Sequence, residues 1–409
     1  MSPLADLAAR ARRQYATNGL RSVLAEGIEF VTKDGWTEVL IRRNYLPRSE
    51  LLNSTKSPSH IRHGDDESRF TVSNPTQPEI RREFEPYPSE FDPDARFLCD
   101  VPDCLLIGRY ALGVSSEGIL SETTPYDTTE LSKKIESQIS SYGSYLRVFG
   151  FDSGRNVDHE LECVFPLVDN GRGYYHWMTE YLPKVGALQR YDRESGVKPT
   201  VLIRSDAGSY VRESLEFVGV DPAQLEEWSG SDTRVGSLLL TQHRPHKFDY
   251  INPQQSTFAL SRDDLLWVRN QVRQRFGYTE NSGNRIYVSR QKANCRRVKN
   301  YGELTRLLEQ FDIEPYVLED LSFEEQMRLF SNAEVIIGPH GAGLTNMIAA
   351  NDPLIVELLP DKIMKPHFHH IAKSMNFQYE PFVTTASTEG LKVDTTALEK
   401  HLRALQRPD

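Results

Sequence analysis

The chain has 409 residues, of which 38% are hydrophobic, and this is enough for two or three domains with buried cores. Its 58 acidic residues outnumber its 48 basic ones, which gives a formal net charge of −10 and a pI of about 5.7. Proteins that bind nucleic acid through bulk charge carry a basic surface, so we do not expect a nucleic-acid partner. A local group of basic residues can still hold a small anion.

Cysteine usage and hydropathy indicate the compartment. The four cysteines, Cys99, Cys104, Cys163 and Cys295, form neither a disulfide framework nor the paired spacing of a zinc site. The N-terminus has no continuous apolar core typical of a secretion signal, and no stretch reaches the roughly 18 apolar residues of a membrane span. The sequence therefore predicts a cytoplasmic protein.

Residues 1–99 are predicted to form an N-terminal region of helices and polar loop. Apolar residues recur at helical spacing over 4–31, with several arginines among them, which indicates two short amphipathic helices. Such helices either pack on the body of the protein or lie on the inner face of an anionic membrane, where each basic side chain adds about 1 kcal/mol. Residues 43–96 are rich in Pro, Ser, Asn, Asp and Arg, as is typical of loops, and the Asp-Pro-Asp at 92–94 is interpreted as a solvated turn rather than a metal site.

Strands and helices alternate over residues 100–253, which predicts a first α/β domain. A meander of short strands comes first, and a strand at 160–167 leads to a helix that carries His176 and Glu180. The two residues are four apart, so they share one helix face. An imidazole and a carboxylate so placed can act as a general base, with the carboxylate orienting the ring, or they can be a buried histidine satisfied by its neighbour.

The stretch from 333 to 359 predicts a strand, a glycine-rich turn, a helix and a second strand. In a parallel sheet such a turn lies at the carboxyl end of a strand, where ligands bind, and its N–H groups suit a nucleotide diphosphate. Near the end of the second strand, Glu357 could accept both ribose hydroxyls. The alternative is an ordinary βα turn followed by an ordinary strand residue. The candidate binding residues of the turn are His340, Gly341, Ala342, Gly343 and Leu344.

Three arginines lie on a strand and loop that precede this stretch. Arg290 ends a predicted strand at 285–290, and Arg296 and Arg297 follow in the loop. If this strand is the neighbour of the strand before the turn, guanidinium groups and backbone N–H groups converge on one anion site. Such a site could replace a metal ion on a departing diphosphate. The alternative is a solvated basic loop.

The His-Gly-Ala-Gly sequence of the turn also resembles the oxyanion loop of some α/β-hydrolases. That chemistry needs a nucleophile elbow of the form G-x-S-x-G, which the sequence lacks. A hydrolase is therefore not supported.

Five motifs follow one another in the chain. They are YHWMTEYLP at 175–183, YVSR at 287–290 with RRVKN at 296–300, LSFEEQMRLF at 321–330, GPHGAGLTN at 338–346 and VEL at 356–358. In this order they resemble glycosyltransferase family 61. The family includes plant xylan arabinosyl- and xylosyltransferases, animal protein O-linked N-acetylglucosaminyltransferases and microbial enzymes of the capsular-polysaccharide type. The resemblance covers about residues 100–359 and is specific as a set.

The resemblance implies a GT-B-like α/β fold in which two Rossmann-like, doubly wound domains face a cleft. The acceptor would bind to residues 100–253 and the nucleotide sugar to residues 254–365, while residues 366–409 would form terminal helices that pack back on the body. It implies an inverting hexosyl- or pentosyltransferase that needs no metal or other cofactor. A UDP-sugar is the expected donor, and a glycan, glycolipid or glycoprotein hydroxyl in cell-surface polysaccharide or protein glycosylation is the expected acceptor.

The family's site residues carry over to this chain with one departure. His176 or Glu180 would deprotonate the acceptor hydroxyl, and the arginines with the His340 turn would stabilise the leaving nucleoside diphosphate. Relatives carry Asp four residues after the histidine, whereas this chain has Glu180, whose side chain is one methylene longer. The alternative function is a non-catalytic nucleotide- or glycan-binding protein with the same fold.

Overall fold

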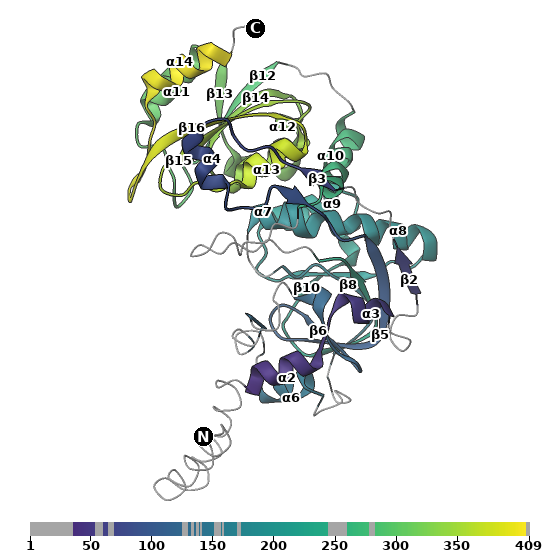
Figure 1. The fold of residues 1–409 in the computed structure, drawn as a ribbon. Helices are drawn as coiled ribbons and strands as arrows, with labels where there is room; N and C mark the ends of the chain where they lie inside the picture. Colours follow the sequence, from purple (N-terminus) through teal and green to yellow (C-terminus); the bar gives the residue numbers. More distant parts are fainter. Residues whose placement is uncertain are drawn as a thin grey trace, which may run out of the picture.

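The computed structural model describes residues 36–53, 60–63, 69–124, 130–131, 135, 139, 141–150, 157, 159–169, 173–243, 260–277 and 283–405. The helices predicted over 4–31 lie outside these residues. The chain forms a mixed α/β fold around two large sheets, one in each half of the molecule (Figure 1). No helix among the described residues is long and apolar enough to cross a bilayer.

The first half contains a nine-stranded mixed sheet of order β1-β7-β6-β5-β11-β8-β9-β10, with β2 paired to β5. Strands β11, β8, β9 and β10 are parallel, whereas β5, β6 and β7 form the predicted meander and β5 runs antiparallel to β11. The strands are β1 (Tyr45–Leu46), β2 (His60–His63), β5 (Phe97–Ile107), β6 (Leu112–Ser115), β7 (Gly118–Leu120), β8 (His159–Pro166), β9 (Thr200–Arg204), β10 (Leu225–Trp228) and β11 (Thr233–Thr241).

The predicted doubly wound arrangement therefore does not extend to β5, β6 and β7. The connections between β5, β6 and β7 are tight turns, and these can join only antiparallel strands, because a parallel pair needs a long crossover.

The second half contains a sheet of order β13-β12-β14-β15-β16-β17, in which the first five strands are parallel. Numbered along the chain, this is the order 2-1-3-4-5 of a doubly wound fold, whose switch point lies between β12 and β14. Arg290 directly follows β12 and His340 directly follows β14, and these two strands are neighbours. This is the condition that the predicted anion site required. The strands are β12 (Asn284–Ser289), β13 (Ile313–Val317), β14 (Ala333–Pro339), β15 (Leu354–Pro360), β16 (Gln378–Ser387) and β17 (Gly390–Lys392).

The apolar runs of β14 and β15 are explained by helices on both faces of this sheet. Ile336 and Ile355 pack on one face against α10, α12 and α13, while Ile337 and Val356 pack on the other face against α11 and α14. Adjacent residues of a strand point to opposite faces, so a central strand must be apolar at every position. The helices are α10 (Arg262–Phe276), α11 (Tyr301–Glu309), α12 (Phe323–Ser331), α13 (His367–Ser374) and α14 (Thr395–Leu405).

The C-terminal segment contains the two predicted helices as α13 and α14, but the sequence reading missed β16 and β17 between them. Helix α13 contacts the first half, where the rings of His367 and Phe368 lie 5.1 Å and 6.0 Å from the ring of Tyr175.

The N-terminal region reaches both halves (Figure 1). Helix α4 packs on the second half, where Ile80 and Phe84 contact Leu359 and Met364. The GT-B assignment and the domain boundaries stay predictions. The remaining elements are α2 (Trp36–Asn44), α3 (Arg48–Asn53), β3 (Phe70–Thr71), α4 (Pro78–Phe84), β4 (Glu90–Phe91), α6 (Tyr142–Val148) and α9 (Ser209–Phe217).

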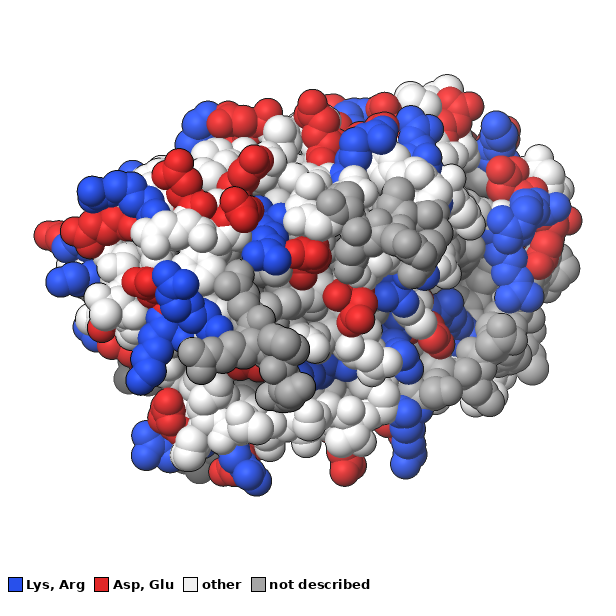
Figure 2. All heavy atoms as spheres, turned by 90° about the horizontal axis from the view of Figure 1, so that it is seen from above, with Lys and Arg blue, Asp and Glu red and all other residues white. Residues whose placement is uncertain are grey.

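Charged side chains are mixed on the surface seen in Figure 2. Lys and Arg alternate there with Asp and Glu, and no broad field of one sign covers the described part of this face. This face therefore lacks the basic stripe that a nucleic acid would need.

Candidate active site

A helical run with irregular hydrogen bonding carries the first candidate pair. It begins with α7 (Tyr174–His176), continues through a π-helical turn (η2, Trp177–Tyr181) and a 3-10 turn (η3, Leu182–Lys184), and ends with α8 (Val185–Ser195). A π-helical turn is rare and occurs most often at functional sites. The candidate residues thus lie where the backbone hydrogen bonding departs from that of a regular α-helix.

His176 and Glu180 contact each other in this run, as the spacing predicts. The Nδ1 atom of His176 is hydrogen-bonded to Oε1 of Glu180. The His176 side chain is 15% exposed, whereas the Glu180 side chain is fully buried. The imidazole is therefore the member of the pair that a substrate can reach, and the carboxylate orients it.

The second half contains a matching pair that the sequence reading did not recognise. The Nδ1 atom of His340, in the turn after β14, is hydrogen-bonded to Oε1 of Glu357 on β15. The Tyr379 hydroxyl on β16 donates to the other carboxylate oxygen at 2.5 Å. Burial and the adjacent Glu357 carboxylate raise the pKa of Tyr379 well above its usual range, so the phenol stays a donor.

The expected contact of Glu357 with ribose needs correction. The residue is 0% exposed, and both of its carboxylate oxygens accept hydrogen bonds from the protein. A ligand cannot reach them, so Glu357 instead orients the His340 ring. The sequence signal for this role was an acidic residue inside a strand that is apolar on both faces.

Arg290 and the glycine-rich turn come together at the switch point of the second sheet. A Cβ atom on Gly341 would lie 2.1 Å from Nη1 of Arg290, so the guanidinium lies directly on the turn. Nε and Nη2 of Arg290 donate to the Cys295 carbonyl at 3.3 Å and 3.2 Å. Burial and the charge of Arg296 lower the pKa of Arg290, so two guanidinium groups lie close together. Two adjacent positive charges would be stabilised by an anion.

The other residues of the loop differ in their positions. Arg296 has a left-handed backbone, with φ of 58°, which brings it to the same cluster as Arg290. Arg297 is exposed, its carbonyl accepts from Leu391 N–H at 2.8 Å, and no contact joins its side chain to the turn among the described residues. Partial burial opposes ionisation of the Cys295 thiol, but the charges of Arg296 and Arg290 outweigh it and lower the pKa of this thiol. The cluster thus consists of Arg290 and Arg296, without Arg297.

The last residues of the turn serve the fold. The segment Ala342–Ala349 (η7) is a 3-10 run rather than the expected α-helix. Leu344 is 0% exposed, and its N–H donates to the Gly341 carbonyl at 2.9 Å, so its expected nucleotide contact is wrong. Gly343 is needed for packing, because a Cβ atom there would lie 2.9 Å from Leu318. Ala342, the first residue of the run, is partly exposed, and its contact with a nucleotide stays a prediction.

Contacts between the halves bring the two histidine pairs toward one interface. The Tyr174 hydroxyl donates to Oδ1 of Asn346 at 2.5 Å. The ring of Tyr175 contacts His176 at 5.3 Å and His367 at 5.1 Å, and the ring of His367 lies 5.8 Å from that of His340. His176 and His340 are thus linked through Tyr175 and His367. His367 was missed because nothing in its local sequence marks it.

No group of three His, Cys, Asp or Glu side chains in the described part of the chain is arranged so that it could hold a metal ion. The site that the geometry defines consists of a basic cluster on a glycine turn at a sheet switch point, beside a partly exposed histidine held by a buried carboxylate. This combination is typical of an α/β protein that binds an anionic ligand and can move a proton.

Comparison with known proteins finds a family match. The model of the family described as Glycosyltransferase 61 matches residues 174–356, from α7 to β15. This range contains both members of the first histidine pair, the arginine cluster and the His340 turn. The resemblance that the motifs predict is confirmed over this range.

Three curated relatives match shorter segments. They are a β-1,2-xylosyltransferase of Arabidopsis thaliana (39% identity over 64 residues), the β-1,2-xylosyltransferase RCN11 of Oryza sativa subsp. japonica (35% over 60) and an EGF domain-specific O-linked N-acetylglucosamine transferase of Gallus gallus (30% over 77). The matches cover 15%, 14% and 18% of this chain, and only 12%, 11% and 14% of the respective relatives. They therefore identify a shared segment and not a shared whole protein.

Proposed function

We propose that this protein is an inverting glycosyltransferase that moves a sugar from a nucleotide donor to a hydroxyl of a glycan or glycoconjugate. The observation that carries the proposal is the seating of Arg290 on the Gly341 turn, across the Tyr175–His367 contact from the His176–Glu180 pair. One side of this arrangement suits a diphosphate and the other suits a hydroxyl that must lose its proton. The family match and the transferase names of the relatives agree with this division.

On the donor side, Arg290 and Arg296 pair with the diphosphate oxygens and the turn supplies N–H groups. His340, held by Glu357, begins the same turn, and its ring would donate a hydrogen bond to a phosphate oxygen. These groups would stabilise the negative charge that develops on the leaving diphosphate, without a metal ion being required. A UDP-sugar, with either a hexose or a pentose, is the donor class that we propose.

On the acceptor side, His176 removes the proton from the acceptor hydroxyl, because it is the exposed member of its pair. The acceptor oxygen then forms a bond to the anomeric carbon while the bond from that carbon to the phosphate oxygen breaks, and its electron pair stays on the diphosphate. Attack opposite the leaving group inverts the anomeric carbon. Glu180 stabilises the imidazolium that forms.

The GT-B arrangement, a role in cell-surface polysaccharide or protein glycosylation, a cytoplasmic location and a peripheral membrane contact of the N-terminal helices remain part of this proposal. The names of the relatives, which include xylosyl and N-acetylglucosamine transfer, make xylose and N-acetylglucosamine the first sugars to test.

The direct test is a thermal-shift panel with UDP, GDP, CMP and dTDP, with and without EDTA, followed by turnover assays with the matching sugar nucleotides. A ligand that binds only the folded state adds about 2.7 kcal/mol of stability at a hundredfold excess over its Kd. We expect a shift with UDP that persists in EDTA, and transfer or slow hydrolysis of a UDP-sugar. Nucleotide binding without any turnover would favour the non-catalytic alternative, and the absence of any shift would contradict the proposed donor site.

A further inference from the structure

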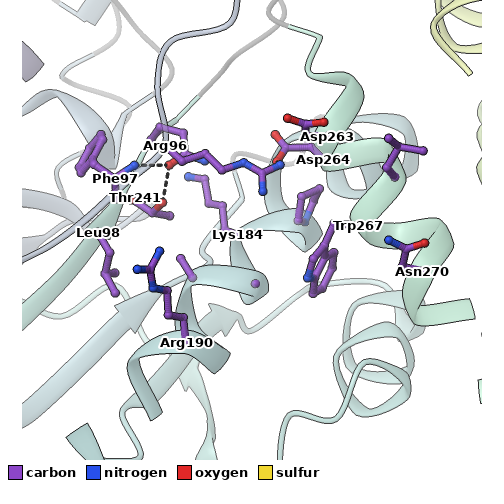
Figure 3. A pocket seen from close by; sticks show the side chains of 15 residues that line it. Arg96, Phe97, Leu98, Lys184, Arg190, Thr241, Asp263, Asp264, Trp267 and Asn270 are labelled. Atoms are coloured by element: carbon purple, nitrogen blue, oxygen red, sulfur yellow. Dashed lines mark hydrogen bonds and ion pairs between the residues drawn. The ribbon is translucent and has the colours of Figure 1, made fainter. Parts of the chain in front are cut away.

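A pocket of about 440 Å³ lies between α8 and the adjoining ends of β5 and β11, in the first half, and α10, which packs on the sheet of the second half (Figure 3). Its volume is within the range of small-molecule sites. None of the residues of the donor site described above lines it. The proposed function therefore leaves it without a role.

The floor of the pocket holds two buried side chains with N–H groups to spare. Lys184 and Gln242 are each 8% exposed. Nζ of Lys184 donates to Nδ1 of His243 at 3.0 Å, and this is its one hydrogen bond within the described structure. Oε1 of Gln242 accepts from Phe97 N–H at 3.2 Å and from the Thr241 hydroxyl at 2.7 Å, whereas its amide nitrogen has no partner among the described residues.

These spare donors call for oxygen acceptors inside the pocket. Nζ of Lys184 has N–H groups beyond the one that binds His243, and the amide of Gln242 has no partner within the described structure, so both can donate to a ligand that supplies oxygens. Burial lowers the pKa of Lys184 to about 8, and the nearby carboxylates of Glu122 and Glu180 oppose this effect, so the ammonium remains the main form at neutral pH.

One wall of the pocket is the indole of Trp267, which packs against Gly186. A Cβ atom on Gly186 would lie 2.9 Å from Nε1 of Trp267, so only glycine lets the indole pack against α8. Arg190, one turn further along α8, lies on the other side of the pocket, and Asn270 follows Trp267 on α10 (Figure 3). The wall therefore combines a flat apolar ring with polar groups at the rim.

The charges around the pocket are largely neutralised within the protein. Arg96 pairs with Asp264 at 2.9 Å, and Arg190 pairs with Glu194 at 2.9 Å. A strongly anionic ligand such as a phosphate would find no arginine cluster of the kind seen at Arg290. A ligand with many hydroxyl groups and an apolar ring face fits better, because hydroxyls accept from the floor and donate to Asp263 at the rim.

We propose that this pocket is a carbohydrate subsite that binds one sugar residue of the acceptor glycan, remote from the hydroxyl that is glycosylated. The inference rests on the proposed function. Lys184 follows His176 by eight residues, which corresponds to about 12 Å along the helical run. A sugar residue held in the pocket would thus anchor the acceptor at a distance and help to orient its reactive end.

The first experiment measures sugar binding without any donor. Saturation-transfer NMR is recorded with methyl β-xyloside, methyl α-mannoside, N-acetylglucosamine and glucuronate, and with inorganic phosphate as a competitor. The blocking variant is Ala187→Phe, because Ala187 lines the pocket and a phenyl group there fills it. Ala397→Phe on the exposed face of α14 is the matched control, and thermal unfolding with and without UDP reports whether each variant is folded.

We expect saturation transfer to at least one sugar in the wild type and in the control variant Ala397→Phe. This signal should be lost in the blocking variant Ala187→Phe. For the transfer reaction we expect Ala187→Phe to raise the acceptor KM on the order of tenfold, with UDP affinity unchanged. Asn270→Ala, which removes only a rim amide, should give a smaller effect in the same direction.

Two results would overturn the subsite. The first is that no sugar binds, or that binding survives Ala187→Phe in a folded protein. The second is displacement of the bound sugar by phosphate. If the wild type transfers sugar and Ala187→Phe has the same acceptor KM as the wild type, this would also refute the subsite while leaving the proposed function intact. Sugar binding that is lost in Ala187→Phe, in a protein without transferase activity, would instead support a sugar pocket and refute the proposed function.

Discussion

Two histidine–carboxylate pairs occur in this protein, and their different exposure separates their roles. The side chains of His176 and His340 are 15% and 5% exposed, and each ring is held through Nδ1 by a buried glutamate. In both pairs the carboxylate fixes the ring orientation. The more exposed ring suits proton removal from an acceptor, whereas the enclosed ring beside the arginines suits a hydrogen bond to the donor.

His176→Ala should lower kcat by about 10²–10⁴-fold, the usual contribution of a positioned general base, with little effect on UDP affinity. Glu180→Asp should cause a smaller loss, because the shorter side chain keeps the carboxylate but draws it back from Nδ1. Initial rates and calorimetric titration with UDP measure both quantities. Full activity in His176→Ala would remove this residue from the mechanism.

Arg290→Ala and Arg297→Ala should differ, although the sequence alone places both arginines in the expected anion site. Arg290 lies on the Gly341 turn, so its removal should weaken UDP binding by roughly 1.5–3 kcal/mol, the contribution of charged hydrogen bonds. Arg297 is exposed and its side chain has no contact with the turn among the described residues, so Arg297→Ala is the control with near-normal affinity. Equal losses, measured by calorimetry, would show that ligand binding rearranges the loop.

At the scale of elements, the glycine turn and the switch point act together. Strands β12 and β14 are adjacent and parallel, and the chain leaves them in opposite directions along the sheet, to β13 and to β15. The ends of the two strands therefore bring together a basic loop and a turn that are some fifty residues apart in sequence. Gly341 allows the guanidinium to approach the backbone, which no residue with a side chain would allow without a shift.

Gly341→Ala should weaken UDP binding while leaving the thermal midpoint almost unchanged. The new methyl group would meet the end of the Arg290 side chain, which can move away, but this movement removes the guanidinium from the turn. Gly302→Ala in α11 is the matched control, because a Cβ atom there meets nothing within 4 Å. The two variants are compared by thermal unfolding and UDP titration, and unchanged affinity in Gly341→Ala would contradict the arrangement.

For the whole molecule, α13 is the element that joins the parts of the fold. His369 on this helix contacts the ring of Phe84 from α4 at 5.4 Å and that of Tyr379 from β16 at 5.0 Å. Burial, followed by the charge of Lys373, lowers the pKa of His369 from 6.5 to about 3. The neutral ring is thus part of a packed interface in which burial disfavours the protonated form.

The free energy of unfolding should consequently fall as the pH drops from 6.5 toward 3. In this window the unfolded chain binds a proton at His369 and the folded chain does not, so protonation favours unfolding, by up to roughly 4 kcal/mol at pH 3. His369→Phe should remove this part of the pH dependence. Urea unfolding of both proteins between pH 7 and pH 4 tests this, and parallel curves would contradict the assignment.

The sequence by itself determined the alternation of strands and helices, the doubly wound second half, the His176–Glu180 contact and the resemblance to glycosyltransferase family 61. These features depend on short-range periodicity and on motifs whose residues lie close together in the chain. Only the tertiary structure decided that Glu357 holds His340, that Leu344 lies in the core, that Arg297 is separate from the cluster and that β5 pairs antiparallel with β11. These depend on which strands become neighbours and which side chains are buried between them, and such long-range contacts leave no periodic signal in the sequence.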